Sequence, residues 1–247
     1  HKPNPFGGVV TDPERLGNNP KQFKQALHKS LNAWRALGIL VVWLEVPISK
    51  AVLVPVAVDA GFSYHHAGED YLLLTLQLVE GAHIPPYATH YIGAGGVVVD
   101  SKYNLLTVRE KYGFGERVPT LKLPGGTLRS GEHLADAVVR EVLEETGIAT
   151  CFETMVCFRH WHGYKYGRSD IYFVCRLSPL NIEITMQSEE IQECIWMPVE
   201  EFLNATDVSD FNKWIVRAGL NTSGMQIASV DGYVTSQERE FFISAVR

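Results

Sequence analysis

Three glutamates near the middle of the chain have the residue type and the spacing to bind a divalent cation. At about 100° per residue of helix, Glu141, Glu144 and Glu145 lie within roughly 100° of one another on the helix wheel. Clustered carboxylates repel one another, whereas Mg²⁺ prefers hard oxygen ligands and completes its shell with waters and substrate phosphates. Arg140 can orient one of these glutamates through a forked hydrogen bond. The segment therefore predicts metal-dependent phosphate chemistry, with a solvated, charged helix as the alternative.

The helix that carries these glutamates has recognisable ends. Ser130 or Gly131 can begin it. Glu132 then lies in the first turn, where the helix dipole favours an anion, and Gly147 ends the helix. An apolar arc beside the glutamates can be buried, and it consists of Ala135, Val139, Val142 and Leu143.

The same segment fits a long spacing pattern, GX5EX7REUXEEXGU, where U is a bulky aliphatic residue. The match covers every specified position: Gly126, Glu132, Arg140, Glu141, Val142, Glu144, Glu145, Gly147 and Ile148. On this pattern the chain resembles the Nudix hydrolase superfamily. The resemblance implies an α/β/α sandwich built on a mixed sheet, in which a loop-helix-loop segment holds the metals.

The resemblance also implies roles for individual residues. Gly125 would lend its backbone carbonyl to a metal, and Glu144 and Glu145 would be metal ligands. Glu141 would be a general base or an auxiliary ligand, and Arg140 would position it. The implied cofactor is Mg²⁺, with Mn²⁺ as a substitute.

Many members of the superfamily draw a further glutamate from outside this segment. Glu189 and Glu190 are the candidates here, and Glu190 is preferred because it has the Glu-Ile-x4-Trp spacing of relatives. We expect Glu190 to act as a catalytic residue and metal ligand. The alternative is that both are solvated loop glutamates.

A closer resemblance covers nearly the whole chain, and it rests on VVWLEVP, AVDAGFSYHHA, GAGGVVVD and GRSDIYFVCRLSPL. These segments resemble the Nudix branch of the plant ADP-ribose and NADH pyrophosphatases and the animal antisense fibroblast growth factor (GFG) protein. The branch implies a homodimer that converts ADP-ribose first, and NADH second, to AMP and a phosphate ester. Arg168 stands where relatives often have Lys, and no SQPW-type motif is present, which weakens the case for NADH.

A cluster of cationic and aromatic residues follows the glutamate segment. Trp161, Tyr164 and Tyr166 are interleaved with the cations, so the cluster could hold terminal phosphates and stack a base. A solvated loop is the structural alternative. The predicted substrate-binding residues are Arg159, His160, His162, Lys165 and Arg168.

Two other functions stay open at this point. A diphosphoinositol polyphosphate would also suit the cationic cluster, and it is favoured if Arg159, Lys165 and Arg168 converge on the metal site. A regulatory or binding protein with a Nudix fold and little turnover is the third hypothesis. The intact glutamate segment argues against it.

The elements that must position these residues suggest an α+β protein with two domains. Residues 20–80 contain a helix, a strand, a second helix and a further strand, and Pro85 and Pro86 interrupt the chain after them. We therefore expect a small N-terminal α/β pre-Nudix domain over residues 1–84. The Nudix hydrolase domain is expected over residues 85–247.

Composition limits the partners of the protein. The net charge of -6 gives no general attraction to nucleic acid or to an anionic membrane, so a small phosphorylated substrate is the expected partner. No apolar run reaches the length of a membrane span. The four cysteines lack CxxC spacing and are expected to be buried free thiols, which suits an intracellular, cytoplasmic location. Secretion after removal of an upstream signal is the alternative.

Two further patterns are given structural roles. His65 and His66 are adjacent on an expected strand, so their side chains should point to opposite faces and should not share a metal ion. The glycines of GAGG lack the spacing of a dinucleotide-binding loop and indicate close packing of a strand.

Overall fold

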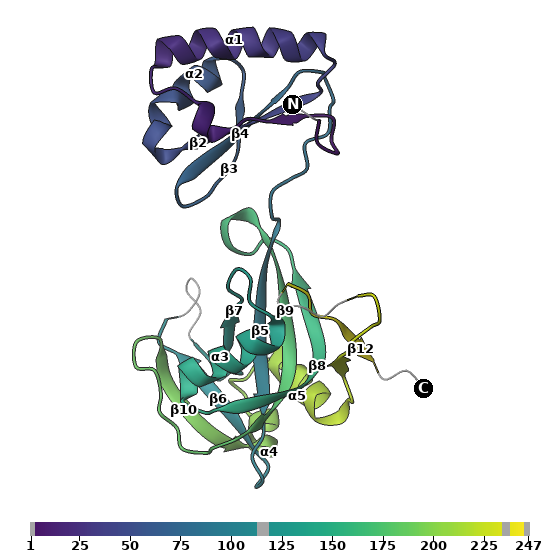
Figure 1. Cartoon of the computed structure of the whole chain (residues 1–247). Coiled ribbons are helices and arrows are strands. Elements are labelled where there is room, and N and C mark those ends of the chain that lie inside the picture. The colour runs from purple at the N-terminus through teal and green to yellow at the C-terminus, as the bar shows by residue number, and fades with distance from the viewer. Residues whose placement is uncertain (1–2, 113–118, 234–237, 245–247) are drawn as a thin grey trace. The chain divides into compact units, whose positions relative to one another are not determined.

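The computed structural model describes residues 3–112, 119–233 and 238–244. The chain divides into two compact units, His1–Thr89 and His90–Arg247 (Figure 1). Each unit has hydrophobic core clusters of its own.

Unit 1 is a four-stranded sheet with helices on one face. The strand order is β1-β2-β4-β3, in which β1 and β2 are parallel and the other neighbours are antiparallel. The strands are β1 (Val9–Val10), β2 (Val41–Pro47), β3 (Ser63–Ala67) and β4 (Tyr71–Gln77). The helices are η1 (Pro13–Arg15), α1 (Pro20–Ala36), η2 (Ile48–Leu53) and α2 (Val54–Asp59).

Helix α1 forms where the local sequence supplies its ends and its apolar stripe. The Asn19 side chain accepts hydrogen bonds from the backbone N–H groups of Lys21 and Gln22, and Gly38 takes a left-handed conformation after the last turn. The buried stripe packs on the β2 residues Val42 and Leu44, so Trp43 and Glu45 lie on the opposite face of the sheet. The stripe consists of Phe23, Leu27 and Leu31.

Unit 2 is built on a six-stranded mixed sheet in the order β12-β11-β8-β9-β5-β7, with a separate β10-β6 pair. Strands β5 and β9 are parallel, and the other pairs are antiparallel. The strands are β5 (His90–Val98), β6 (Asn104–Glu110), β7 (Gly125–Thr127), β8 (Thr150–Trp161), β9 (Ser169–Pro179), β10 (Ile191–Pro198), β11 (Met225–Ile227) and β12 (Phe242–Ser244).

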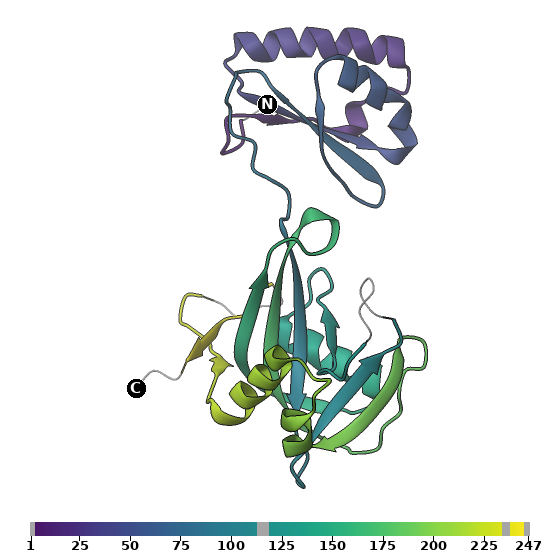
Figure 2. The same ribbon diagram turned by 180° about the vertical axis from the view of Figure 1, so that it is seen from behind.

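Helices cover both faces of this sheet. Helix α3 (Leu134–Thr146) packs on one face, as Figure 1 shows, through Val138 and Val142. Helices α4 (Val199–Asn204) and α5 (Asp210–Asn221) pack on the other face, which Figure 2 shows from the front. The predicted α/β/α sandwich with a mixed sheet is confirmed, and so is the α/β character of the N-terminal unit.

The structure can be compared with two expectations from composition, one on membrane-spanning helices and one on the cysteines. No helix within residues 3–112, 119–233 and 238–244 is long and apolar enough to cross a membrane. All four cysteines are free thiols, but the expectation that all are buried is wrong: Cys175 is buried, whereas Cys151 is exposed. Alternation along β8 turns Cys151 to the side opposite the buried Thr150.

Candidate functional site

Helix α3 carries the three predicted glutamates and ends as expected at Gly147, which is left-handed. The predicted start at Ser130 or Gly131 is wrong, because the helix begins at Leu134. Glu132 therefore lies in the turn before the helix. The buried face also differs from the expected arc: it includes Leu134, Ala135, Val138 and Val142, whereas Leu143 is exposed.

The first turn of α3 is capped by a distant residue. His133 at the N-cap makes no side-chain capping hydrogen bond. Instead, the backbone N–H groups of Leu134 and Ala135 donate to the two carboxylate oxygens of Glu240, at 2.8 and 3.3 Å. No local signal predicts this partner, because Glu240 lies about a hundred residues downstream.

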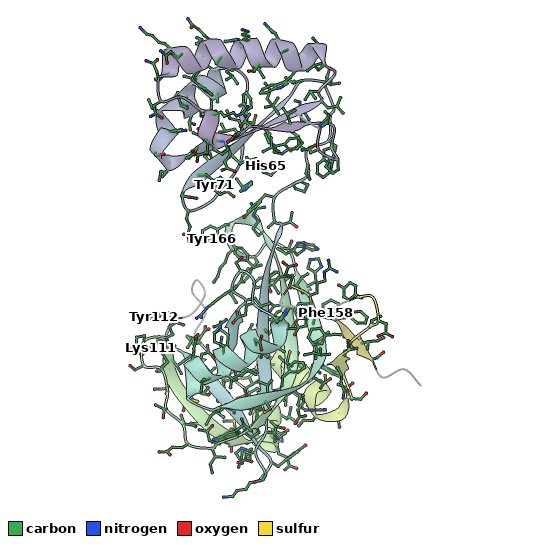
Figure 3. All side chains as sticks on the ribbon, viewed as in Figure 1. His65, Tyr71, Lys111, Tyr112, Phe158 and Tyr166 are labelled. Atoms are coloured by element: carbon green, nitrogen blue, oxygen red, sulfur yellow. The ribbon has the colours of Figure 1, made fainter. Side chains whose placement is uncertain are left out.

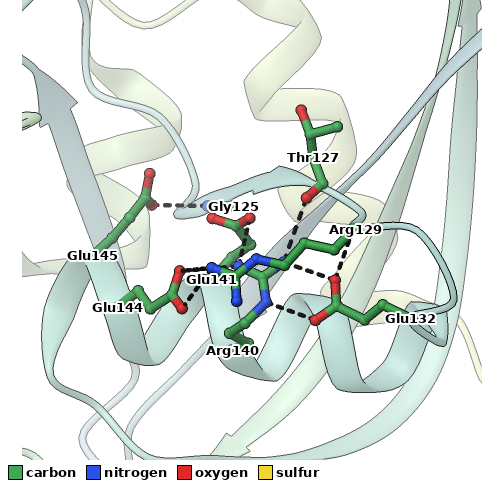
Figure 4. Close-up of polar contacts among 8 residues, drawn as sticks. All are labelled: Gly125, Thr127, Arg129, Glu132, Arg140, Glu141, Glu144 and Glu145. Atoms are coloured by element: carbon green, nitrogen blue, oxygen red, sulfur yellow. Dashed lines mark hydrogen bonds and ion pairs between the residues drawn. The ribbon is translucent and has the colours of Figure 1, made fainter. Parts of the chain in front are cut away.

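Arg140 is the centre of a carboxylate network on the surface of α3 (Figure 4). Its Nε and Nη2 donate to the two oxygens of Glu132 at 2.6 and 2.8 Å. Its Nη1 donates to Glu141 at 2.8 Å and to Glu144 at 2.9 Å. These hydrogen bonds, the one to Glu132 above all, raise the pKa of Arg140 above its usual range, so the guanidinium stays charged. The arrangement orients Glu141 and Glu144 and offsets their repulsion.

Glu144 has a second cationic partner that the sequence patterns did not indicate. Arg129 Nη2 donates to both carboxylate oxygens of Glu144, at 3.0 and 3.2 Å. Because the Glu144 side chain is about two-fifths exposed, this ion pair is weak and can exchange.

Glu145 differs from its neighbours because it is buried, at 6% exposure. One of its oxygens accepts a hydrogen bond of 2.9 Å from the backbone N–H of Gly125, which Figure 4 also shows. Burial raises the pKa of Glu145 to about 7, although nearby Lys122 and the hydrogen bond from Gly125 lower it. A bound cation would relieve this cost of desolvation.

The donor set fits a hard divalent cation in its chemistry. Carboxylates of Glu141, Glu144 and Glu145 and the backbone of Gly125 supply oxygen atoms of the kind that Mg²⁺ prefers. Among the described residues, however, no group of three or more His, Cys, Asp or Glu side chains is already assembled around one point. Arg140 donates hydrogen bonds to Glu141 and Glu144 instead, at 2.8 and 2.9 Å.

The two glycines of β7, Gly125 and Gly126, have close neighbours that leave little space for a side chain. A Cβ on Gly126 would lie 2.5 Å from the Glu141 carboxylate, and a Cβ on Gly125 would lie 2.2 Å from the Ala94 carbonyl oxygen. Gly125 also has a φ of +150°, which side-chain-bearing residues rarely adopt. A side chain at Gly125 would therefore displace backbone atoms of β5, whereas one at Gly126 would displace the Glu141 carboxylate.

A cavity of about 450 Å³ opens beside Gly125 and Gly126. Glu110 from β6 and Lys122 line it and form an ion pair with each other. Neither was singled out from the sequence. The strand alternation of Asn104–Glu110 could have indicated which face Glu110 occupies, but nothing local pairs it with Lys122.

The cavity also contains the first residue of the predicted cationic cluster. The Arg159 guanidinium donates to the buried Asp170. Its Cζ lies 5.2 to 5.5 Å from the ring centroids of Trp161, Tyr172 and Phe211. All five residues line the cavity. The Arg159 guanidinium is thus ion-paired with Asp170 and lies among three aromatic rings.

Strand geometry separates the other members of the cluster. Strand β8 continues to Trp161, so Arg159 and Trp161 share one face while His160 points to the other face and contacts His90 at 2.9 Å. The His162 Nδ1 contacts the Ser169 hydroxyl, at 2.9 Å.

Lys165 lines the cavity, and its Nζ lies 5.4 Å from the centroid of the Tyr164 ring. Within the described part of the chain, His160, His162 and Arg168 are not among the lining residues.

The predicted loop glutamates lie in an exposed turn before β10. The Glu190 carbonyl accepts a hydrogen bond from the Lys111 N–H, which ties this turn to the end of β6. Neither Glu189 nor Glu190 belongs to the cavity lining among the described residues. Among the described residues, Glu110 is the only glutamate that lines the cavity.

Comparison with known proteins adds family information to this geometry. A family model described as a Nudix hydrolase domain matches residues 1–78, and one described as a NUDIX domain matches residues 89–218. Nudix hydrolase 8 of Arabidopsis thaliana is 39% identical over 200 residues, which cover 80% of this chain and 54% of that protein. The chain therefore spans about half the length of that relative.

Two further relatives are covered more completely. Nudix hydrolase 2 of Arabidopsis thaliana is 38% identical, and the match covers 83% of this chain and 74% of that protein. A Mus musculus protein called nucleoside diphosphate-linked moiety X motif 6 is 33% identical, with 86% of this chain and 69% of that protein covered.

Proposed function

Because the chain belongs to the Nudix hydrolase family, we propose that it hydrolyses the diphosphate linkage of a nucleoside diphosphate derivative. ADP-ribose is the first candidate and NADH the second, and the products are AMP and a phosphate ester. The observation that carries the proposal is the hydrogen bond from the Gly125 N–H to the buried Glu145 carboxylate. Gly125 lines the same cavity as the Arg159 guanidinium. A relative named for nucleoside diphosphate-linked compounds supports the substrate class.

Mg²⁺ is the proposed cofactor, with Mn²⁺ as a substitute. Gly125 and the α3 glutamates Glu141, Glu144 and Glu145 would hold it. Glu190 would be a further ligand from outside the helix. When bound, Mg²⁺ supplies positive charge to the diphosphate oxygens and lowers the pKa of water.

The protein residues orient and accept protons in this proposal. Arg140 holds Glu141 at 2.8 Å beside Gly126, so its carboxylate can accept the proton of the attacking water. Lys165 brings positive charge to the cavity, where the diphosphate would lie, whereas Lys122 is paired with Glu110. Arg140 itself is a positioning residue, because its guanidinium donates to the carboxylates of Glu132, Glu141 and Glu144.

The cavity favours a substrate that contains an aromatic ring over one that is densely phosphorylated. A diphosphoinositol polyphosphate needs several converging cations. Arg159 is instead neutralised by Asp170, and Arg168 is not among the described lining residues. Stacking on aromatic rings is worth about 1 to 3 kcal/mol per base, so the Trp161 and Phe211 rings beside Arg159 suit a nucleobase.

A substrate panel tests the proposed reaction. Product analysis would use Mg²⁺ with ADP-ribose, NADH, CoA, a diadenosine polyphosphate and a diphosphoinositol polyphosphate. We expect turnover of an ADP-linked compound that falls by at least about a hundredfold in Glu144→Gln, because a charge-stabilising ligand is lost. The exposed loop variant Glu183→Gln is the matched control and keeps its activity.

Other outcomes of the panel would select the alternatives. Preference for the inositol compound would replace the nucleotide proposal. If every compound stayed intact while one still bound, the protein would be a binding or regulatory member of the family with little turnover.

The division of labour between the two parts of the chain is also proposed. Residues 85–247 would carry the hydrolase site, and residues 1–84 would form a pre-Nudix domain. We propose a homodimer as the working assembly, and sedimentation velocity at several protein concentrations tests it.

A further inference from the structure

Unit 1 contains a second hollow that is unrelated to the glutamate helix. Its volume is about 300 Å³, and it lies on the face of the β1-β2-β4-β3 sheet away from α1. Figure 3 shows His65 and Tyr71 on this side of the sheet. The side chains that line the hollow include Phe6, Trp43, Glu45, His66, Tyr71 and Leu73.

Strand alternation brings most of these residues to one face. Trp43 and Glu45 are two apart on β2, and Tyr71 and Leu73 are two apart on the adjacent strand β4. Glu45 pairs with Leu73 across the two strands. Phe6 closes the hollow from the N-terminal segment, with its ring centroid 6.2 Å from that of Trp43.

A β-bulge adds His66 to the same face. The register shifts between Tyr64 and His66, so His66 lies opposite Leu73. The prediction that His65 and His66 point to opposite faces is therefore wrong, since their Nδ1 atoms lie 2.7 Å apart. His66 is held by Tyr71 Oη at 3.0 Å and by stacking on Tyr87 at 3.9 Å.

Glu45 is the charged group of this hollow. It is half-buried on a central strand, and it takes part in none of the ion pairs formed by the described residues. Burial, and then the neighbouring His65, lower the pKa of His66, and the Glu45 carboxylate raises it to a smaller extent. A partly desolvated carboxylate without a cation is costly to maintain.

We propose that this hollow binds a small organic ammonium ion, with Glu45 as the counter-ion and the rings of Phe6, Trp43 and Tyr71 as its walls. Aromatic faces attract ammonium groups through the ring quadrupole, and the attraction grows when the site is partly desolvated. The volume suits a compact ligand rather than a dinucleotide. This site is independent of the proposed hydrolase function.

The test uses the full chain with choline as the cationic probe and 3,3-dimethyl-1-butanol as its uncharged isostere. Binding is followed by NMR through the indole N–H signal of Trp43, assigned with Trp43→Phe. We expect choline to shift this signal and to bind at least about tenfold more tightly than the alcohol, which corresponds to a cation–π and charge contribution of about 1.4 kcal/mol or more.

Two variants assign the effect to Glu45. Glu45→Gln should weaken choline binding by at least about tenfold, whereas Glu69→Gln, which removes the same charge from an exposed turn, should leave it unchanged. Equal binding of the two probes by the unmodified protein would overturn the proposal without relying on any variant. So would the absence of a Trp43 shift, or equal losses in Glu45→Gln and Glu69→Gln.

Discussion

At the residue scale, the chemistry of the site depends on one arginine and the carboxylate behind it. Glu132 uses both oxygens to hold Arg140, and it also accepts a hydrogen bond from the Arg129 N–H. The Arg140 hydrogen bond lowers the pKa of Glu132 to about 2. Glu132 therefore acts on Glu141 and Glu144 through Arg140, and its loss should affect stability as well as rate.

We predict that Glu132→Gln lowers the free energy of unfolding by about 1 to 2 kcal/mol at neutral pH. The pKa of Glu132 is lower in the folded state than its usual value of 4.5, so the charged form stabilises the fold. This contribution is complete above about pH 4.5 and is lost as the pH falls towards about 2.

Urea denaturation at several pH values measures this difference. The gap between the parent protein and Glu132→Gln should narrow as the pH is lowered, while Glu183→Gln should follow the parent throughout. A gap that stayed constant with pH would contradict the assigned ion pair.

At the scale of elements, the β7 turn and α3 must fit closely for Glu141 to be in position. We predict that Gly126→Ala reduces kcat by about a hundredfold with the fold retained, because the new methyl group displaces the Glu141 carboxylate. Steady-state kinetics and circular dichroism measure the two properties. Gly17→Ala is the control, since a Cβ there meets nothing within 4 Å. Normal kcat in Gly126→Ala would remove Glu141 from the proposed mechanism.

The start of α3 gives a second prediction at this scale. Glu240→Ala leaves the N–H groups of Leu134 and Ala135 without their carboxylate partner and should cost about 1 kcal/mol of stability. Thermal unfolding should show a Tm lower by several degrees, with Glu183→Ala unchanged. An unchanged Tm would mean that solvent replaces Glu240 as the cap.

At the scale of the whole molecule, the two units have separate cores. The core of unit 1 uses residues of α1, α2, β2 and β4, and both cores of unit 2 use residues from Ala94 onward. We predict that residues 85–247 fold cooperatively when expressed alone, because their core clusters contain no residue of unit 1. A cooperative thermal transition and the substrate panel check this. A fragment without a transition would show that unit 1 is needed for folding.

The sequence by itself determined the family, the sandwich and the helix that carries the glutamates. The GX5EX7REUXEEXGU spacing is local, and its resemblance to Nudix hydrolases is confirmed by the family models and the Arabidopsis relatives. Gly147 ends α3 as expected, and the GAGG glycines pack closely, with a Cβ on Gly95 lying 2.0 Å from Tyr172 Oη. Neighbouring residues fix the helical periodicity and the left-handed conformation at Gly147, whereas the contact partner of Gly95, Tyr172, comes from β9.

Tertiary structure decided which residues meet from distant parts of the chain. Glu240 caps α3, Glu110 pairs with Lys122, and Asp170 neutralises Arg159. A bulge in β3 turned His66 towards Glu45, and the extension of β8 sent His160 away from the cavity. Strand register and packing set these contacts, and a shift of one residue reverses the face on which a side chain lies. Local spacing does not specify that register, so sequence patterns identified the chemistry of the site but not all of its members.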